Sequence, residues 1–168
     1  MGVFNKGDVG VNLDGVHGRI HEGQFFIASE FNQIGNKATL IYLVSTHEKS
    51  AHFAFDITTN GDVEVNFYKQ VTVSTVGTVI EGLNANDFST TSALTIITTG
   101  ATLSDTGTLW ECSLSISGPG QSRSSQTLGS RLEEFVLKTN DFYALSIENL
   151  NVTTLDLCAR IGWYEPQV

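Results

Sequence analysis

Apolar and polar residues alternate one by one within residues 51–69, on both sides of an Asn60-Gly61 pair. The apolar side chains stand at every second position, at Phe53, Phe55 and Ile57 before the pair and at Val63, Val65 and Phe67 after it. A period of two predicts two strands, each with one apolar face. Because Asn-Gly favours a two-residue type I′ turn, the pattern predicts a β-hairpin whose apolar face is covered by more sheet.

Other runs of apolar and β-branched residues, bordered by turn formers, predict further strands. They cover residues 24–30, 38–45, 93–98, 109–116, 142–148 and 153–164. A capping box at Ser130 and Glu133 permits one helical turn, and a strand over residues 134–138 is the alternative that we favour. With eight to ten strands and no helix of three turns, the sequence predicts an all-β, antiparallel β-sandwich that is jelly-roll-like.

Residues 1–22 are rich in Gly and lack a sustained apolar period, so we predict an extended N-terminal arm. Its apolar side chains, which include Val3, Phe4, Val9 and Val11, would let it lie along a partner; a loose terminus is the alternative. Residues 23–168 are predicted to form a single β-sandwich domain, since a chain of 168 residues suits one core.

The pattern Ser-x-x-Gly-Thr occurs at residues 74–78 and again thirty residues later, at 104–108. Gly77 and Gly107 are expected to supply positive φ in two turns at similar ends of neighbouring strands. No other part of the chain shares this spacing, so we interpret the pattern as a local similarity between two turns rather than a solenoid repeat. Residues 117–126, with two Gly and one Pro, are predicted to be an exposed loop.

The composition is acidic, with eighteen acidic against nine basic residues and a formal net charge of −9. Such a surface repels polyphosphate, which argues against nucleic-acid binding. The sequence contains no run of 18 apolar residues and does not start with a basic segment followed by an apolar one. We therefore expect neither a membrane span nor a secretory signal, and synthesis in a cytoplasm.

The two cysteines, Cys112 and Cys158, each lie within an apolar stretch. We predict two buried, reduced thiols, with a disulfide between neighbouring strands as the alternative.

Candidate catalytic and metal-binding residues are few. His17 and His21 could hold a metal ion together only on a helix, which the surrounding Gly residues disfavour. Carboxylate pairs such as Glu133 with Glu134, or Asp56 with Asp62, could serve glycoside hydrolysis only at the right separation. A sugar-stacking platform is a further candidate, built from Trp110, Trp163, Tyr143 and Tyr164. Aromatic residues in strands belong more often to the core, which is the alternative to the platform. Since none of these candidates forms a specific motif, we predict no enzyme activity, cofactor or metal site.

Several short motifs follow one another between His17 and Glu165. They are His21-Glu-Gly-Gln-Phe-Phe26, the segment 52–68, Ser74-x-x-Gly-Thr78, Asn84-x-Asn86, Gly107-Thr108, the segment 134–143, Asn149 and Gly162-Trp-Tyr-Glu165. Their order and spacing resemble a family of small virion proteins of tailed bacteriophages, which are β-sandwich proteins associated with the capsid. At Asp87 the chain differs, because such proteins tend to carry Arg there.

The resemblance implies a structural protein without cofactor or catalytic residues. We expect a homotrimer that decorates or cements the outer surface of a bacteriophage capsid, after synthesis in the host cytoplasm. Its partners would be itself and the major capsid protein, contacted through the arm at Val3, Phe4, Val9 and Val11. The acidic charge suits the outside of a capsid, because it discourages binding to packaged DNA.

The alternative function is a receptor- or glycan-binding module of a phage tail or fibre. Such a module would act through exposed aromatic residues and through the loop at residues 117–126, with Gly118, Pro119, Gly120 and Arg123 as candidate contacts.

Overall fold

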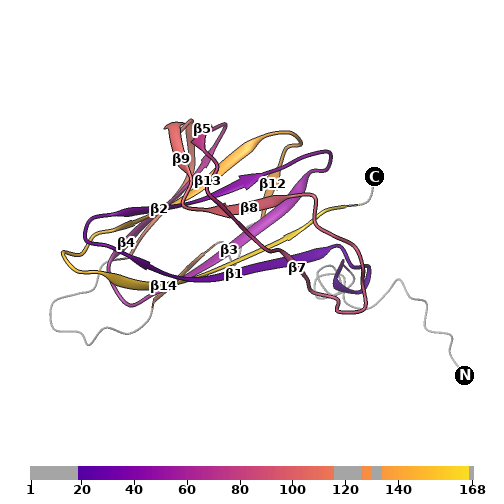
Figure 1. Cartoon of the computed structure of the whole chain (residues 1–168), viewed down its shortest axis with the longest axis horizontal. Coiled ribbons are helices and arrows are strands. Elements are labelled where there is room, and N and C mark those ends of the chain that lie inside the picture. Colours follow the sequence, from indigo (N-terminus) through magenta and orange to yellow (C-terminus); the bar gives the residue numbers. More distant parts are fainter. Residues whose placement is uncertain (1–18, 116–125, 130–133, 167–168) are drawn as a thin grey trace, which may run out of the picture.

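The computed structural model describes residues 19–115, 126–129 and 134–166, and these form three antiparallel sheets (Figure 1). The first sheet has the order β11 (Gln126–Gly129), β3 (Ala51–Thr59), β14 (Leu155–Tyr164), β1 (Phe25–Ile34) and β7 (Leu83–Asn84), and β12 (Phe135–Leu137) also pairs with β3. The second sheet has the order β10 (Thr108–Ser115), β4 (Val63–Lys69), β13 (Phe142–Asn149), β2 (Thr39–Ser45), β8 (Ile96–Thr99) and β6 (Thr78–Ile80). A small third sheet pairs β5 (Thr72–Thr75) with β9 (Thr102–Asp105).

The strand order is that of a jelly roll, which confirms the predicted fold class. Successive strands change sheet: β1 and β2 lie in opposite sheets, as do β3 and β4, and β13 and β14. Four strands of each principal sheet therefore have the orders β1-β14-β3-β11 and β2-β13-β4-β10, which is the interleaved order of two Greek keys. No helix in the described residues is long and apolar enough to span a membrane.

The predicted hairpin of residues 51–69 is wrong in its pairing, although both of its strands exist. β3 is hydrogen-bonded to β14 and β4 to β13, so the two strands face each other across the core. The rings of Phe53 and Phe67 stack with centroids 5.3 Å apart. This arrangement buries the two apolar faces against each other, whereas in a hairpin they would lie side by side and a further sheet would have to cover them.

The Asn60-Gly61 pair turns the chain from one sheet to the other, and neither residue has positive φ. The amide of Asn60 donates to Asp156 Oδ2 at 2.9 Å. A Cβ on Gly61 would lie 2.7 Å from the side-chain Nδ2 of Asn151, so the glycine allows a close approach of this side chain and does not form a type I′ turn.

The core fills the space between the two principal sheets with apolar side chains from alternate positions. Its largest fully buried members include Trp163, Tyr42, Phe26, Phe53 and Phe67. The ring of Trp163 stacks on Phe26 with centroids 5.8 Å apart. The favoured strand over residues 134–138 is confirmed by β12, and Ser130 and Glu133 of the alternative helical turn lie outside the described residues.

Residues 70–107 form an insertion between β4 and β10. It contains two similar halves, residues 70–77 and residues 100–107. In each half the chain leaves the second sheet at a residue with positive φ, Gln70 (60°) or Gly100 (72°). It contributes β5 or β9 to the small sheet and returns through a second such residue, Gly77 (86°) or Gly107 (64°). The predicted positive φ at both glycines is confirmed.

The two halves are related by a local twofold axis. β6 pairs with β8 through Thr78 and Thr99, and β10 pairs with β4 through the equivalent residues Thr108 and Lys69. Because β5 and β9 are antiparallel, the two glycine turns lie at opposite ends of the small sheet, not at similar ends as predicted. The small sheet covers a separate buried cluster on the second sheet, formed by Leu43, Val71, Ala101 and Ala144, and it is seen near β2 in Figure 1.

Gly77→Ala and Gly107→Ala should each destabilise the domain by about 2 kcal/mol more than Gly100→Ala does. A Cβ at Gly77 would lie 2.3 Å from the carbonyl oxygen of Thr99, and one at Gly107 would lie 2.4 Å from that of Lys69. Gly100 is the matched control because its φ is also positive but no atom lies within 4 Å of its Cβ position. Equal losses in urea unfolding for all three variants would contradict the crowding argument.

Both cysteines are free and exposed, which corrects the prediction of buried thiols. In β14 buried residues occupy alternate positions from Leu155 onward, and Cys158 falls between them on the outer face. Cys112 lies on β10 of the other sheet, opposite Asn66. In a strand the parity of a position decides burial, so apolar neighbours in sequence did not indicate a buried thiol.

Candidate functional site

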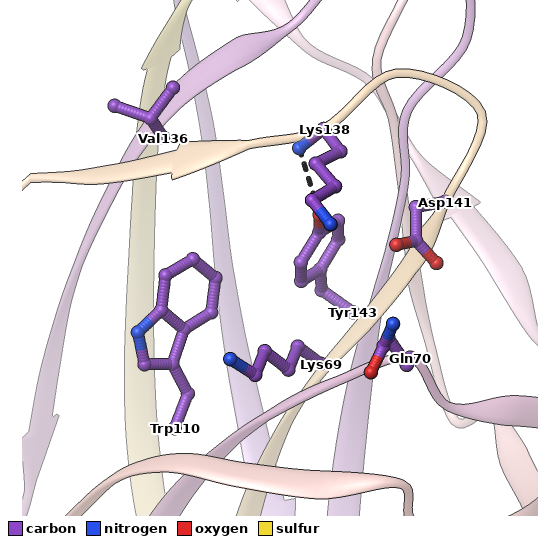
Figure 2. A pocket seen from close by; sticks show the side chains of 7 residues that line it. All are labelled: Lys69, Gln70, Trp110, Val136, Lys138, Asp141 and Tyr143. Atoms are coloured by element: carbon purple, nitrogen blue, oxygen red, sulfur yellow. Dashed lines mark hydrogen bonds between the residues drawn. The ribbon is translucent and has the colours of Figure 1, made fainter.

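The candidate site is a pocket of about 220 Å³ where β4 and β10 of the second sheet approach β12 of the first (Figure 2). Seven residues line it: Lys69, Gln70, Trp110, Val136, Lys138, Asp141 and Tyr143. They come from β12, from the end of β4 and from the starts of β10 and β13, with the residues next to these strands, so the jelly-roll order brings together segments far apart in sequence.

A β-bulge positions the indole of Trp110. On β10, Leu109 pairs with Tyr68 and Glu111 pairs with Phe67, so Trp110 is an extra residue without a partner on β4. Such a bulge re-aims the side chain of the extra residue. Here the indole stacks near Phe67, with centroids 5.8 Å apart, and packs edge-on against Phe135 at 5.1 Å. It remains 38% exposed, so the core supports part of the ring and the rest faces the pocket.

Two lysines approach the pocket from different strands. Lys69 occupies the end of the inward row of β4, after Val65 and Phe67, and its Nζ lies 5.2 Å from the centroid of the Trp110 ring. Lys138 follows β12, and its side chain extends toward the same space (Figure 2). In the described part of the chain, neither ammonium group forms an ion pair with a carboxylate. In a chain of net charge −9, this pocket therefore combines two cations with the single carboxylate of Asp141.

Tyr143 closes the inner end of the pocket. Its hydroxyl oxygen accepts a hydrogen bond from the backbone N–H of Lys138 at 2.8 Å. Burial raises the pKa of Tyr143 above its ordinary value, so the hydroxyl stays protonated and keeps a proton to donate. The carboxylate of Asp141 accepts from the N–H of Phe142 at 2.9 Å, which fixes its position beside Gln70. The lining offers an aromatic face, cations and hydrogen-bonding groups, but no nucleophile paired with a base.

A second polar cluster lies on the outer face of the first sheet. Nδ1 of His52 is 2.7 Å from the hydroxyl of Tyr164 and 2.6 Å from Oε1 of Glu134. The rings of His52 and Tyr164 stack at 4.2 Å, and the guanidinium of Arg19 lies 5.3 Å from the centre of the Tyr164 ring. Burial and the neighbouring Glu134 raise the pKa of Tyr164. The polar groups of this cluster are one another's partners, so they are not available to a ligand. The cluster therefore connects the turn at residues 19–21 and the start of β12 to the sheet.

The residues predicted from sequence to contact a partner fall outside the described residues. These are Val3, Phe4, Val9 and Val11 in the arm and Gly118, Pro119, Gly120 and Arg123 in the loop. His17 and Glu133 also fall outside. No group of three His, Cys, Asp or Glu side chains suited to holding a metal ion occurs among the residues that are described.

The four aromatic residues considered as a sugar-stacking platform do not come together on the surface. Trp163 and Tyr143 belong to the core, as the core alternative predicted, and are only 1% and 2% exposed. Tyr164 lies in the His52 cluster, and Trp110 lines the pocket with an exposed part of its ring while the buried Tyr143 lines its inner end.

Lys69, Gln70, Lys138 and Asp141 were not predicted as site residues. One signal for Lys69 was present in the sequence, because it continues the apolar row of β4 with a charge.

A search of protein-family models gave no match for this chain, and no curated protein matched it.

Proposed function

We propose that this chain is a structural virion protein that decorates or cements the outside of a bacteriophage capsid as a homo-oligomer. The proposal extends the resemblance carried by the motifs between His17 and Glu165. Jelly-roll sandwiches are common in viral capsid proteins, and they also serve as lectin domains, so the fold is compatible with the proposal without selecting it.

The observation that carries the proposal is a band of apolar and aromatic side chains on the outer face of the first sheet, bordered by the His52 cluster. One row across the sheet consists of Leu83, Ile27, Gly162 and Ala54, which are neighbours in register. In the next row Phe25 and Val136 lie at the two ends, and the stacked rings of Tyr164 and His52, which belong to the polar cluster, lie between them. Leu83 is 61% exposed and Val136 54% exposed, at opposite edges of this band. Contiguous apolar surface of this kind is characteristic of contacts between proteins.

The test combines light scattering with sedimentation on capsids of the phage that encodes the chain. We expect an oligomer, with a trimer as the predicted state, that co-sediments with capsids. Leu83→Lys and Val136→Lys place charges in the band and should weaken assembly or capsid binding at least tenfold. Val152→Lys is the matched control, since Val152 is 75% exposed and lies outside the band.

A monomer that does not co-sediment with capsids would overturn the proposal.

Deletion of residues 1–16 tests the arm separately. The shortened chain should no longer bind capsids, while its urea unfolding midpoint should stay unchanged.

A second candidate function, a glycan-binding module of a tail or fibre, is favoured by the Trp110 pocket. A partly exposed indole with a fixed orientation, beside hydrogen-bonding groups, is suited to stacking on a sugar ring. Binding of glycans by the isolated protein, with loss of binding in Trp110→Ala, would support this function independently of any capsid.

A further inference from the structure

The residues around Trp110 indicate which kind of ligand the pocket could bind, and the first of these features is how the indole is held in place. The indole is held by Phe67 and Phe135, with Tyr143 at a centroid distance of 6.0 Å. A ring fixed by three aromatic neighbours loses little conformational freedom when a ligand stacks on it. The C–H groups of a sugar ring carry partial positive charge and are attracted to the negative face of the indole.

Lys69 determines which sugars could use this indole. Its ammonium already stands near the ring, 5.2 Å from the centroid. A neutral sugar that stacks on the indole would displace this cation from a favourable position and offer it no charged partner. A sugar with a carboxylate would compensate the displaced ammonium with a charge-assisted hydrogen bond. The arrangement therefore favours acidic over neutral sugars.

Lys138 adds a second cation near the same space, from the other sheet (Figure 2). Neither Lys69 nor Lys138 is paired with a carboxylate within the described residues, so both ammonium groups can bind an anion. Asp141 and Gln70 lie beside them, where they can accept from and donate to sugar hydroxyls. The carboxylate of Asp141 would repel a second anionic group, so one acidic group per bound sugar fits the lining best.

The size of the pocket is consistent with a short segment of a polysaccharide. Its volume of about 220 Å³ is below the roughly 300–1,000 Å³ of pockets that enclose a drug-sized ligand. A pocket of this size accommodates one sugar residue, while the rest of a chain would extend over the surface.

We propose that the Trp110 pocket binds a saccharide that carries a carboxylate, with the sugar ring on Trp110 and its carboxylate between Lys69 and Lys138. The inference deepens the glycan-binding candidate function and rests on it. It specifies the chemical class of the ligand, a uronic or other carboxylated sugar, and assigns the two lysines as specificity-determining residues.

The experiment uses the full chain and calorimetric titration with tetragalacturonate. Fully methyl-esterified tetragalacturonate is the matched ligand, because the ester removes the charge and keeps the rings. We expect the acid to bind with a Kd below about 1 mM and the ester to bind at least tenfold more weakly. Raising the salt concentration should weaken binding of the acid and leave that of the ester unchanged.

Lys69→Met and Lys138→Met should each weaken binding of the acid about tenfold. Lys138→Met should leave binding of the ester unchanged, whereas Lys69→Met should strengthen it, because the ester then displaces no ammonium from the indole. Lys49→Met removes a lysine outside the pocket and should change neither. Trp110→Ala should abolish binding of both ligands. Because this substitution also removes contacts with Phe67 and Phe135, Trp110→Phe is compared with it, and urea midpoints check that each variant is folded.

The outcomes separate this inference from the candidate function on which it rests. Equal binding of acid and ester, lost in Trp110→Ala, would overturn the carboxylate preference and leave the glycan-binding function standing. Binding of neither ligand, nor of sialyllactose as a second carboxylated probe, would overturn both. An acid preference that survives both lysine substitutions would refute the roles assigned to Lys69 and Lys138.

Discussion

Phe67→Ala is expected to lower the free energy of unfolding by about 3–5 kcal/mol. Phe67 is 1% exposed and lies at the centre of an aromatic cluster drawn from both principal sheets. Its ring is within 6.2 Å, centroid to centroid, of five others: Phe53, Phe55, Trp110, Phe135 and Tyr143. Removing it opens a cavity between the sheets and leaves each neighbour without part of its packing.

Urea unfolding measures this loss, and Phe88→Ala provides the same chemical change as a control. Phe88 is 98% exposed, so its truncation should alter stability by no more than about 0.5 kcal/mol. Since Phe67 also supports the indole, the folded fraction of Phe67→Ala should bind saccharides at the Trp110 pocket more weakly. A stability loss below about 1 kcal/mol would show that the cluster does not hold the two sheets together.

The period-two pattern around Phe67 predicted its strand and its inward orientation, but not the partner of that strand. Alternation records only that one face of a strand is apolar. That face is buried equally well beside a hairpin partner or across a core. The pairing of β3 with β14 joins Phe53 to Trp163, and no local pattern indicates a contact at that sequence separation.

Two asparagines from the motifs quoted in the sequence analysis have structural roles. The amide of Asn84 donates to the carbonyl oxygens of Gly23 and Thr91, and so ties the loop after β7 to the start of β1. The buried amide of Asn149 donates to the carbonyl oxygens of Ile34, Gly35 and Thr153. Both asparagines therefore stabilise the fold.

The Trp110 pocket could not be predicted from the sequence because it depends on register. Trp110 faces the pocket since β10 slips by one residue against β4, and this slip appears only once the two strands are paired. Lys138 and Asp141 join the pocket through the return from β12 to β13, which belong to different sheets. The local signs of the site were the aromatic residues Trp110 and Tyr143, considered for sugar stacking, and a charge at the end of an apolar row, at Lys69.

Glu165→Ala is expected to destabilise the domain by about 3–4 kcal/mol, because one buried carboxylate satisfies three N–H donors. Oε1 of Glu165 accepts from the backbone N–H of Leu94 at 3.0 Å, from that of Thr95 at 2.6 Å and from Nε1 of Trp163 at 3.2 Å. The side chain is 4% exposed and links the end of β14 in the first sheet to the segment that enters β8 in the second. Alanine would leave these donors without an acceptor between the two sheets.

Two conservative variants distinguish the hydrogen bonds from the charge. Glu165→Gln keeps an oxygen at the position of Oε1 and should lose only about 1 kcal/mol, whereas Glu165→Asp is shorter by one methylene and should behave like Glu165→Ala. Urea unfolding ranks the three variants, and the near-ultraviolet circular dichroism of Trp163 should change in the alanine and aspartate variants. If glutamine proves as damaging as alanine, the negative charge and not the acceptor geometry is what joins the two sheets at this end of the sandwich.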